Sequence, residues 1–321
     1  MSRTVRVAAI AACILVVGTG GAAWWLTRGD ELATLRGHRG PVRGVAFAPD
    51  GTALASAGDD GTVRVWDAAT HRERFALAGH AGKVRAVAFG PGTLLASAGD
   101  DAVVRVWDCR AGAEVATFAR PTKTLECLAV SPDGATVAAG GFEGVIFLWK
   151  AADGTPLKPL KGHTKHVHAL AFTPDGKTLI SGGDDGGIRF WDWTAGTQTA
   201  LVALNRQHIH GLAVTADGTT LAAAVGGAGV RRWALPGRAA LPTVEGSGMI
   251  RGVAAGPDGR VLASAHEDGT VKVWDDATGH LHASWAGHKK VVIAVAVAPD
   301  GKTVASAGSD GTVKRWAVPA K

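Results

Sequence analysis

Cysteine is scarce in this sequence, and so is clustered positive charge. Three cysteines among 321 residues are too few for a disulfide framework, and we interpret Cys109 and Cys127 as ordinary small residues of the interior. Arg3, Arg6 and Arg28 supply half of the net charge of +6, and the remaining excess is scattered. Nucleic-acid binding needs lysines and arginines gathered on one face, so no nucleic acid is expected as a partner.

Runs that favour helices are also few, whereas glycine occurs 45 times. Many glycines imply many turns, and a chain rich in turns with few helical segments is expected to be all-β. The length of 321 residues allows one large domain or two small ones.

The one long apolar run is at the N-terminus. Residues 1–6 are a short basic tail, residues 7–26 carry no charge, and residues 27–30 form a linker. Residues 7–26 are predicted to be a transmembrane signal anchor, because twenty helical residues span about 30 Å, the thickness of the hydrocarbon core. Arg3 and Arg6 would keep the N-terminus cytoplasmic, so the body of a single-pass inner- or plasma-membrane protein would be periplasmic or extracellular. The alternative is a cleaved signal peptide and a secreted protein.

A unit of 41 or 42 residues repeats along the rest of the chain. Each copy has a GH pair, an alternating apolar stretch, a turn such as PDG, a second stretch, a turn such as DDG, and a stretch such as TVRVWD. Period-2 alternation between turn residues predicts antiparallel strands. The seven copies are marked by Trp66, Trp107, Trp149, Trp191, Trp233, Trp274 and Trp316.

These GH and WD pairs, with their period, resemble the WD40-repeat family over about nine-tenths of the chain. The resemblance implies an all-β, seven-bladed WD40 β-propeller over residues 31–318, in which four-stranded sheets stack around an axis. The last copy has no fourth strand after Trp316, while residues 31–36 form a strand without a blade of their own. We expect residues 31–36 to complete the last blade and close the ring. The Ala- and Gly-rich composition is typical of a bacterial-type, membrane-anchored version.

A His, a Ser, an Asp and the Trp recur together in four copies, which includes the make-up of a hydrolase triad. The resemblance implies instead a buried hydrogen-bond chain from indole N–H to Ser, from Ser O–H to His and from His N–H to Asp. Catalysis needs one site and four sets occur in this chain, so it is not expected to be an enzyme. The predicted structural sets are His38, Ser56, Asp60, Trp66; His80, Ser97, Asp101, Trp107; His163, Ser181, Asp185, Trp191; and His288, Ser306, Asp310, Trp316.

The third, fifth and sixth copies lack parts of this set, and the sixth has Gly246 in place of the histidine. Two positions near the set vary together: in copies 1, 2, 4 and 6 a basic residue after the His accompanies an acidic residue before the Asp, which predicts ion pairs. Copies 3 and 5 break this pairing, and an aromatic among unpaired polar groups is typical of a binding hot spot. Drift in a redundant ring is the alternative. The predicted partner-binding residues are Lys123, Glu126, Phe142, Arg206, His208 and His210.

Two His-x-His motifs, His166 with His168 and His208 with His210, stand at equivalent positions in copies 4 and 5. Alternate residues of a strand point to one side, so the four imidazoles could bind zinc or protonate together as a pH switch. No carboxylate or cysteine that would orient them is evident in the sequence. We therefore predict no metal and no cofactor, with this cluster as the alternative.

The function predicted is that of a membrane-tethered, monomeric scaffold. Its protein or peptide partner would bind the top face, which is the face that carries the GH loops and the DDG turns. The alternatives are a periplasmic propeller that senses a ligand or metal and, third, a propeller enzyme with a site in the central channel.

Overall fold

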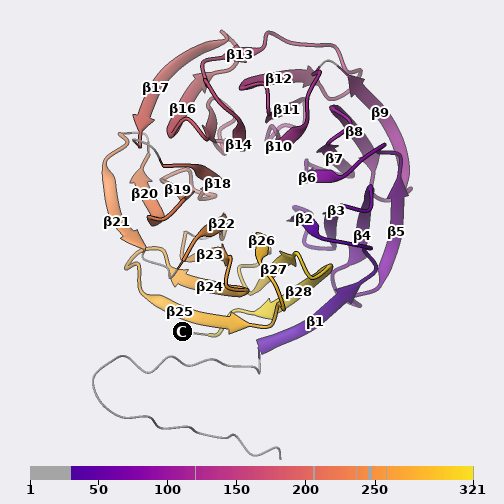
Figure 1. Ribbon diagram of the computed structural model, residues 1–321, viewed down its shortest axis with the longest axis vertical. Helices are drawn as coiled ribbons and strands as arrows, with labels where there is room; N and C mark the ends of the chain where they lie inside the picture. The colour runs from indigo at the N-terminus through magenta and orange to yellow at the C-terminus, as the bar shows by residue number, and fades with distance from the viewer. Residues whose placement is uncertain are drawn as a thin grey trace, which may run out of the picture.

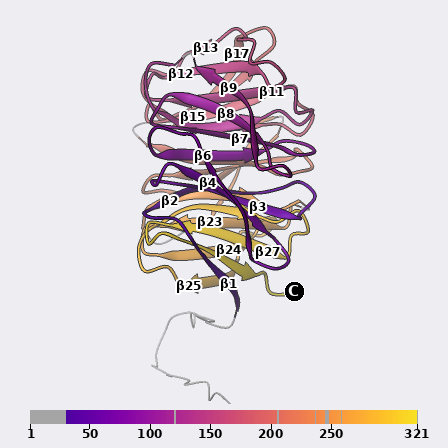
Figure 2. The same cartoon turned by 90° about the vertical axis from the view of Figure 1, so that its right-hand side faces the viewer.

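Four-stranded antiparallel sheets surround a central axis, and there are seven of them in the part of the chain that the structure describes (Figure 1). This computed structural model describes residues 30–119, 121–204, 207–235, 237–244, 248–257 and 259–320. One strand of each sheet faces the axis, and the other three follow outward (Figure 1); Figure 2 shows the same stack of sheets edge-on. The seven-bladed propeller predicted from the repeats is confirmed.

Blades 1 to 6 are each built from four consecutive strands, which run in order from the axis outward. Blade 1 consists of β2 (Val42–Phe47), β3 (Ala53–Gly58), β4 (Thr62–Asp67) and β5 (Glu73–Ala78); blade 2 of β6 (Val84–Phe89), β7 (Leu94–Gly99), β8 (Val103–Asp108) and β9 (Ala113–Ala119); blade 3 of β10 (Leu125–Val130), β11 (Thr136–Gly141), β12 (Val145–Lys150) and β13 (Leu160–Lys161). Blade 4 consists of β14 (Val167–Phe172), β15 (Leu179–Gly183), β16 (Gly187–Asp192) and β17 (Thr197–Ala203); blade 5 of β18 (Ile209–Val214), β19 (Thr220–Val225), β20 (Gly229–Ala234) and β21 (Ala240–Val244); blade 6 of β22 (Ile250–Ala255), β23 (Val261–His266), β24 (Thr270–Asp275) and β25 (Leu281–Ala286).

Blade 7 closes the ring with strands from both ends of the fold. It consists of β26 (Val292–Val297), β27 (Thr303–Gly308), β28 (Thr312–Ala317) and, on the outside, β1 (Glu31–Arg36), which lies beside β28 in Figure 1. An ion pair of 2.8 Å between Lys314 Nζ and Glu31 Oε1 adds to the β1–β28 ladder. Pairing of the first strand with the last sheet leaves neither end of the sheet stack open.

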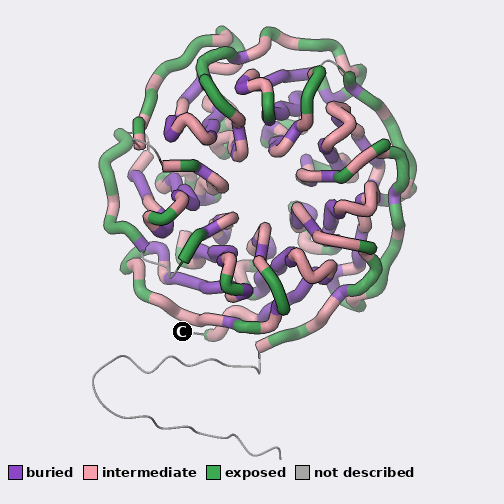
Figure 3. Tube along the Cα trace, viewed as in Figure 1, coloured by how far each residue is buried: buried purple, intermediate pink, exposed green. Residues whose placement is uncertain are grey.

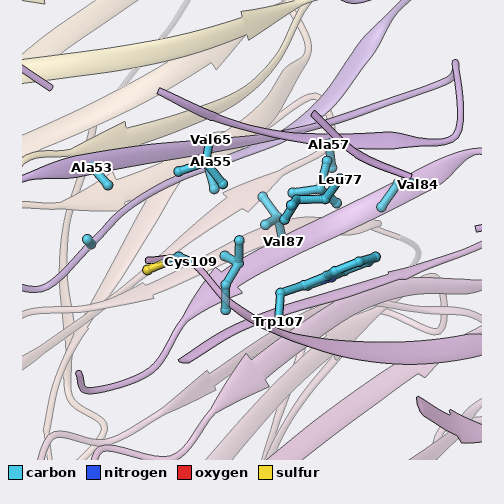
Figure 4. Packing of buried hydrophobic residues seen from close by; sticks show 12 residues of the cluster. Ala53, Ala55, Ala57, Val65, Leu77, Val84, Val87, Trp107 and Cys109 are labelled. Carbon is cyan, nitrogen blue, oxygen red and sulfur yellow. The ribbon is translucent and has the colours of Figure 1, made fainter. Parts of the chain in front are cut away.

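Apolar clusters between neighbouring blades hold the ring together. Between blades 1 and 2, Val65 and Leu77 of blade 1 pack with Val87, Trp107 and Cys109 of blade 2 (Figure 4). The second strands β3, β11 and β27 are buried along their whole length and rich in alanine, so adjacent sheets can approach closely. Exposed residues are concentrated on the outer strands (Figure 3). This stack is the rigid frame that positions the loops of the top face.

The predicted membrane anchor, residues 7–26, lies outside the described residues, as do residues 1–6 and all of the linker except Asp30. Within the described ranges, no helix is both long enough and apolar enough to span a bilayer.

Candidate interaction face at the channel mouth

In blade 1 a hydrogen-bond chain joins two strands to the loop that precedes the blade. The indole N–H of Trp66 donates to Ser56 Oγ at 2.9 Å, and His38 meets Ser56 Oγ through Nε2 at 2.8 Å and Asp60 Oδ1 through Nδ1 at 3.0 Å. An ionised carboxylate only accepts, so Nδ1–H donates to Asp60 and Nε2 accepts from the serine hydroxyl. Burial lowers the pKa of His38, which keeps the ring neutral. Burial alone would raise the pKa of Asp60, but N–H donors from Arg39 and His38 bring it to about 2.

The same chain of contacts occurs in blades 2, 4 and 7. It runs through Trp107, Ser97, His80 and Asp101; through Trp191, Ser181, His163 and Asp185; and through Trp316, Ser306, His288 and Asp310. All four serines are fully buried, and each hydroxyl is engaged by an indole and an imidazole. These Ser-His-Asp sets therefore tie loops to sheets and present no nucleophile to a substrate.

Blade 6 keeps the serine and the tryptophan but takes its histidine from another position. Ser264 Oγ accepts from Trp274 and lies 2.8 Å from Nε2 of the buried His266, the last residue of β23. His266 occupies the position of Gly58 in blade 1, where a Cβ would lie 2.4 Å from His38 Nδ1. A blade therefore has room either for the histidine of the loop or for a side chain at the end of its second strand, but not for both. Blade 6 has the side chain at the strand end, His266. His266 was not among the predicted residues, although SAH in place of SAG was the available signal.

Blade 3 replaces part of what it lacks, and blade 5 has a different polar contact, with its neighbour. In blade 3 Glu143 accepts from the backbone N–H groups of Thr122 and Lys123 at 2.6 and 3.2 Å, as Asp60 does from the loop of blade 1. In blade 5 the buried Arg232 reaches across to blade 6, where its Nη1 lies 2.9 Å from Asp276 Oδ1.

One side chain per blade stands at the rim of the central channel, and in each blade it lies at a β-bulge. In blade 1 Val42 pairs with Gly58 and Gly44 pairs with Ala57, so Arg43 is left without a partner residue in the ladder. The same shift occurs in the other innermost strands. A bulge redirects a side chain, and this one turns it toward the channel mouth, which has a volume of about 600 Å³. The rim residues are Arg43, Arg85, Glu126, His168, His210, Arg251 and Ile293.

The turn between the second and third strands brings another residue beside each rim position. In blade 1 the N–H of Asp59 donates to the carbonyl of Pro41 at 2.9 Å, and an equivalent backbone bond is present in every blade. The turn residues so placed are Asp59, Asp100, Phe142, Asp184, Gly226, Glu267 and Ser309. Rim and turn residues are the two series that vary together in the sequence, and the structure places them side by side.

In blades 1, 2 and 6 the rim arginine is neutralised by its own blade. Arg43 binds Asp59 through Nε and Nη2, at 2.7 and 2.8 Å, and Arg85 Nε lies 2.5 Å from Asp100 Oδ1. Arg251 Nε donates to Glu267 at 2.8 Å. Bidentate and paired groups of this kind satisfy each other and have little left to offer a ligand.

Around blades 3 to 5 the pairing crosses blade boundaries, which corrects the expectation that Glu126 and His208 are unpaired. Glu126 of blade 3 lies 3.7 Å from Arg85 of blade 2 and 2.8 Å from His168 of blade 4. His168 also lies 2.8 Å from Asp184, which pairs with His208 of blade 5 at 2.5 Å. Burial alone would lower the pKa of His168. The carboxylates of Glu126 and Asp184 raise this pKa by a larger amount, so it lies above its usual value. A comparison of residues within each repeat cannot predict contacts between neighbouring repeats.

Two groups at this side of the mouth lie outside the ion pairs, one of them buried and one exposed. His210 Nε2 is buried without a hydrogen-bond partner among the described residues, and burial and the nearby Arg251 lower the pKa of His210 to about 4. Phe142 is 37% exposed and stacks on His166 with ring centroids 4.1 Å apart. Of the other predicted partner-binding residues, Lys123 is exposed and Arg206 lies outside the described residues.

The four histidines of the two His-x-His motifs gather at this side of the mouth. Ring centroids are 6.0 Å apart for His166 and His168, 5.9 Å for His168 and His210, and 6.1 Å for His208 and His210. They form a row rather than a shell around one point, and the carboxylate of Asp184 lies against three of them, since it contacts His166, His168 and His208.

A comparison with models of protein families shows which family the chain belongs to. A family model described as "WD domain, G-beta repeat" matches residues 29–67, 72–108, 112–150, 154–192, 240–275 and 279–317, which is more than half of the chain. The chain belongs to the WD40 repeat family. Residues 193–239, between two matched ranges, contain β17 to β20 and therefore most of blade 5, the blade with the most altered hydrogen-bond set.

Relatives share short stretches of sequence with this chain. The WD repeat-containing protein slp1 of Schizosaccharomyces pombe is 41% identical over 61 residues, 19% of this chain and 12% of that protein. The ribosome biogenesis protein ERB1 of Chaetomium thermophilum is 63% identical over 38 residues (12% and 5%), and the Lissencephaly-1 homolog of Caenorhabditis briggsae is 42% identical over 67 residues (21% and 17%). The chain thus spans less than a fifth of each of these relatives, so its own function has to be argued from its site.

Proposed function

We propose that this WD40 propeller is a non-enzymatic scaffold that binds a protein or peptide partner on its top face, over the channel mouth at blades 3 to 5. The observation that carries the proposal is the contrast around the rim. The arginines of blades 1, 2 and 6 are each neutralised within their own blade. Blades 3 to 5 present an exposed Phe142, and His210 Nε2 is buried there without a hydrogen-bond partner within the described ranges.

The chemistry of this patch favours an occupant with an apolar side chain next to a hydrogen-bonding group. Phe142 offers a ring edge and face for an apolar anchor, and aromatic anchors dominate the energy of many interfaces. His210 is neutral because its pKa is low, and its buried Nε2 would take one hydrogen bond from a group of the partner that enters the channel mouth. The ion pairs around them form a polar rim, which is the usual surrounding of a binding hot spot.

A scaffold role also agrees with the hydrogen-bond sets. Each of the four complete Ser-His-Asp sets holds its serine inside a blade, where the hydroxyl is fully buried. Another nucleophile would have to come from the channel mouth, where five rim residues are held in ion pairs: Arg43, Arg85, Glu126, His168 and Arg251.

Photo-crosslinking from a single position tests the proposal. Phe142 is replaced by p-benzoylphenylalanine in the full-length chain in its own membranes, with Leu32, an exposed residue of the outer strand β1, as the matched control position. We expect one protein to be crosslinked from position 142 and not from position 32, and the yield to fall when His210→Ala is added. Equal crosslinking from both positions, or none from position 142, would overturn the assignment.

We further propose that residues 7–26 tether the propeller to a membrane. The support is the uncharged stretch of twenty residues preceded by two arginines. The expected result is that the full-length chain stays with membranes after washing at alkaline pH, while a chain that begins at residue 27 is washed off. Release of both forms would contradict the tether, and a shortened mature chain in the supernatant would indicate a cleaved signal peptide.

A further inference from the structure

Glu126, His166 and His168 bring three metal-binding atoms together at the channel mouth. One ligand atom from each residue lies within 4.8 Å of the others. Glu126 and His168 are the bulged rim residues of β10 and β14, and His166 precedes β14, so the group joins blade 3 to blade 4. It shares His166 and His168 with the four histidines that the sequence singled out, and has Glu126 in place of His208 and His210.

We propose that these three side chains bind one Zn²⁺ ion. Two imidazole nitrogens and one carboxylate oxygen are a ligand set that zinc accepts in proteins, and with three protein ligands the fourth position stays open to water or to another molecule. The ligand atoms of a tetrahedral zinc are about 3.3 Å apart when the bonds are about 2 Å long. The three atoms lie within 4.8 Å of one another, up to about 1.5 Å wider than that spacing, so binding requires side-chain rotations that draw them together.

The contacts that Glu126 and His166 already make leave their ligand atoms free to bind a metal. Glu126 Oε2 is buried and makes no well-aligned hydrogen bond, although His168 Nδ1 is only 2.8 Å away. His166 contacts Phe142 through the face of its ring, whereas its nitrogen lone pairs lie in the ring plane. His166 can therefore bind a metal and remain stacked.

Asp184 supplies the outer contact that the sequence did not reveal. It lies 2.8 Å from His168 Nε2, on the opposite side of the ring from Glu126. A carboxylate that accepts from one ring nitrogen orients the imidazole and makes the other nitrogen a better ligand. The absence of such a group was the reason to set metal binding aside, and Asp184 removes that reason.

Zinc titration of the full-length chain in detergent tests the site, with Zn²⁺ alone as the probe after treatment with a chelator. Calorimetry should show one ion per chain. Glu126→Gln and His166→Gln should each weaken binding by about 100-fold or more, because each removes a ligand, and Asp184→Asn should weaken it by about 10- to 100-fold. His166 is part-exposed, so His166→Gln tests the site even if a variant at a buried position fails to fold.

His208→Gln is the matched control, because it changes a mouth histidine outside the three ligands. It should retain the affinity of the unmodified chain. Loss of binding in His208→Gln with retention in Glu126→Gln would replace this site by a four-histidine site. Absence of zinc binding by the folded chain, or unchanged binding in Glu126→Gln and His166→Gln, would overturn the proposal. Because the probe is the metal alone, this result does not depend on whether a protein partner binds the same face.

Discussion

In blades 1 and 2 the indole of the third strand is linked through a serine and a histidine to an aspartate, whereas blade 5 has alanine at the serine position and blade 6 has a relocated histidine. The interface between blades 1 and 2 is apolar at the place where blades 5 and 6 have the buried pair of Arg232 and Asp276. At the rim, Arg43 and Arg85 are paired with aspartates of their own blades, but the turn residue beside His210 of blade 5 is Gly226.

The difference shows that the backbone geometry at the bulge and the turn is the same in every repeat, whereas the side chains that make polar contacts vary. All seven innermost strands have the same bulge and all seven turns make the same backbone bond to the loop, whichever side chains they carry. Polar contacts inside and between blades can then be exchanged one set at a time. Substitutions in the two regions can measure how far this exchange goes.

The largest effect is expected in blade 1. Trp66→Ala should lower the free energy of unfolding by about 3–5 kcal/mol, because it removes a buried aromatic ring and one end of the hydrogen-bond chain. Urea denaturation of the full-length chain measures it. Trp66→Phe, which keeps most of the ring but loses the indole N–H, should lose much less, with about 1 kcal/mol assigned to the hydrogen bond. Equal losses in the two variants would mean that the hydrogen-bond chain, not packing, dominates.

The pair between blades 5 and 6 should come next. Asp276→Ala leaves Arg232 buried without a carboxylate and should lower the free energy of unfolding by about 3 kcal/mol. Val65 and Cys109 occupy the equivalent positions between blades 1 and 2. The double variant Arg232→Val with Asp276→Ala makes this interface apolar in the same way, and it should recover most of the stability lost in Asp276→Ala. A double variant no more stable than Asp276→Ala would show that apolar side chains cannot replace the ion pair at this interface.

Moving the histidine of blade 6 into blade 1 tests the exchange directly. Gly58→His alone should lower the free energy of unfolding by about 2 kcal/mol, because its Cβ would collide with His38. Gly58→His combined with His38→Gly reproduces Ser264 with His266 and should regain at least half of that loss. Thermal unfolding of the three proteins suffices. If the double variant is less stable than Gly58→His, the relocated histidine depends on features found only in blade 6.

The smallest effect concerns acid. The pKa of His210 is lowered to about 4 by burial and by Arg251, His168 and His208, with Asp184 acting in the opposite direction. A lowered pKa means that its contribution to stability is complete above about 6.5, the unfolded value, and is lost as the pH falls toward 4. His210→Gln should therefore lose less melting temperature between pH 7 and pH 5 than the unmodified chain.

Arg43→Gln is the control for this measurement, because it changes the matching rim residue of blade 1 and removes no group that titrates in that range. It should keep the acid sensitivity of the unmodified chain. The buried histidines of blades 1, 2 and 4, whose pKa values are lowered by burial, titrate in all three proteins and cancel in the comparison. Identical pH dependence of His210→Gln and the unmodified chain would contradict the low pKa.

The propeller could be predicted because the GH and WD pairs and their period resemble WD40 repeats, and because a four-stranded unit cannot bury both faces of its sheet alone. The surplus strand at residues 31–36 likewise pointed to its place beside β28. Contacts between copies were beyond the sequence, since the spacing within a repeat does not show which side chains meet across a blade boundary. Glu126 with His168 and Arg232 with Asp276 are of this kind. His266 was missed because a histidine was sought only in the loop.

The most direct test of the central claim compares the two sides of the rim in one binding measurement. Full-length chain, a Phe142→Ala/His210→Ala variant and an Arg43→Ala/Arg85→Ala variant are each crosslinked in cells, and the captured proteins are quantified. We expect one enriched protein that is lost from the Phe142/His210 variant and retained by the Arg43/Arg85 variant. Retention by the first and loss from the second would place the partner on blades 1 and 2 and contradict a docking site at blades 3 to 5.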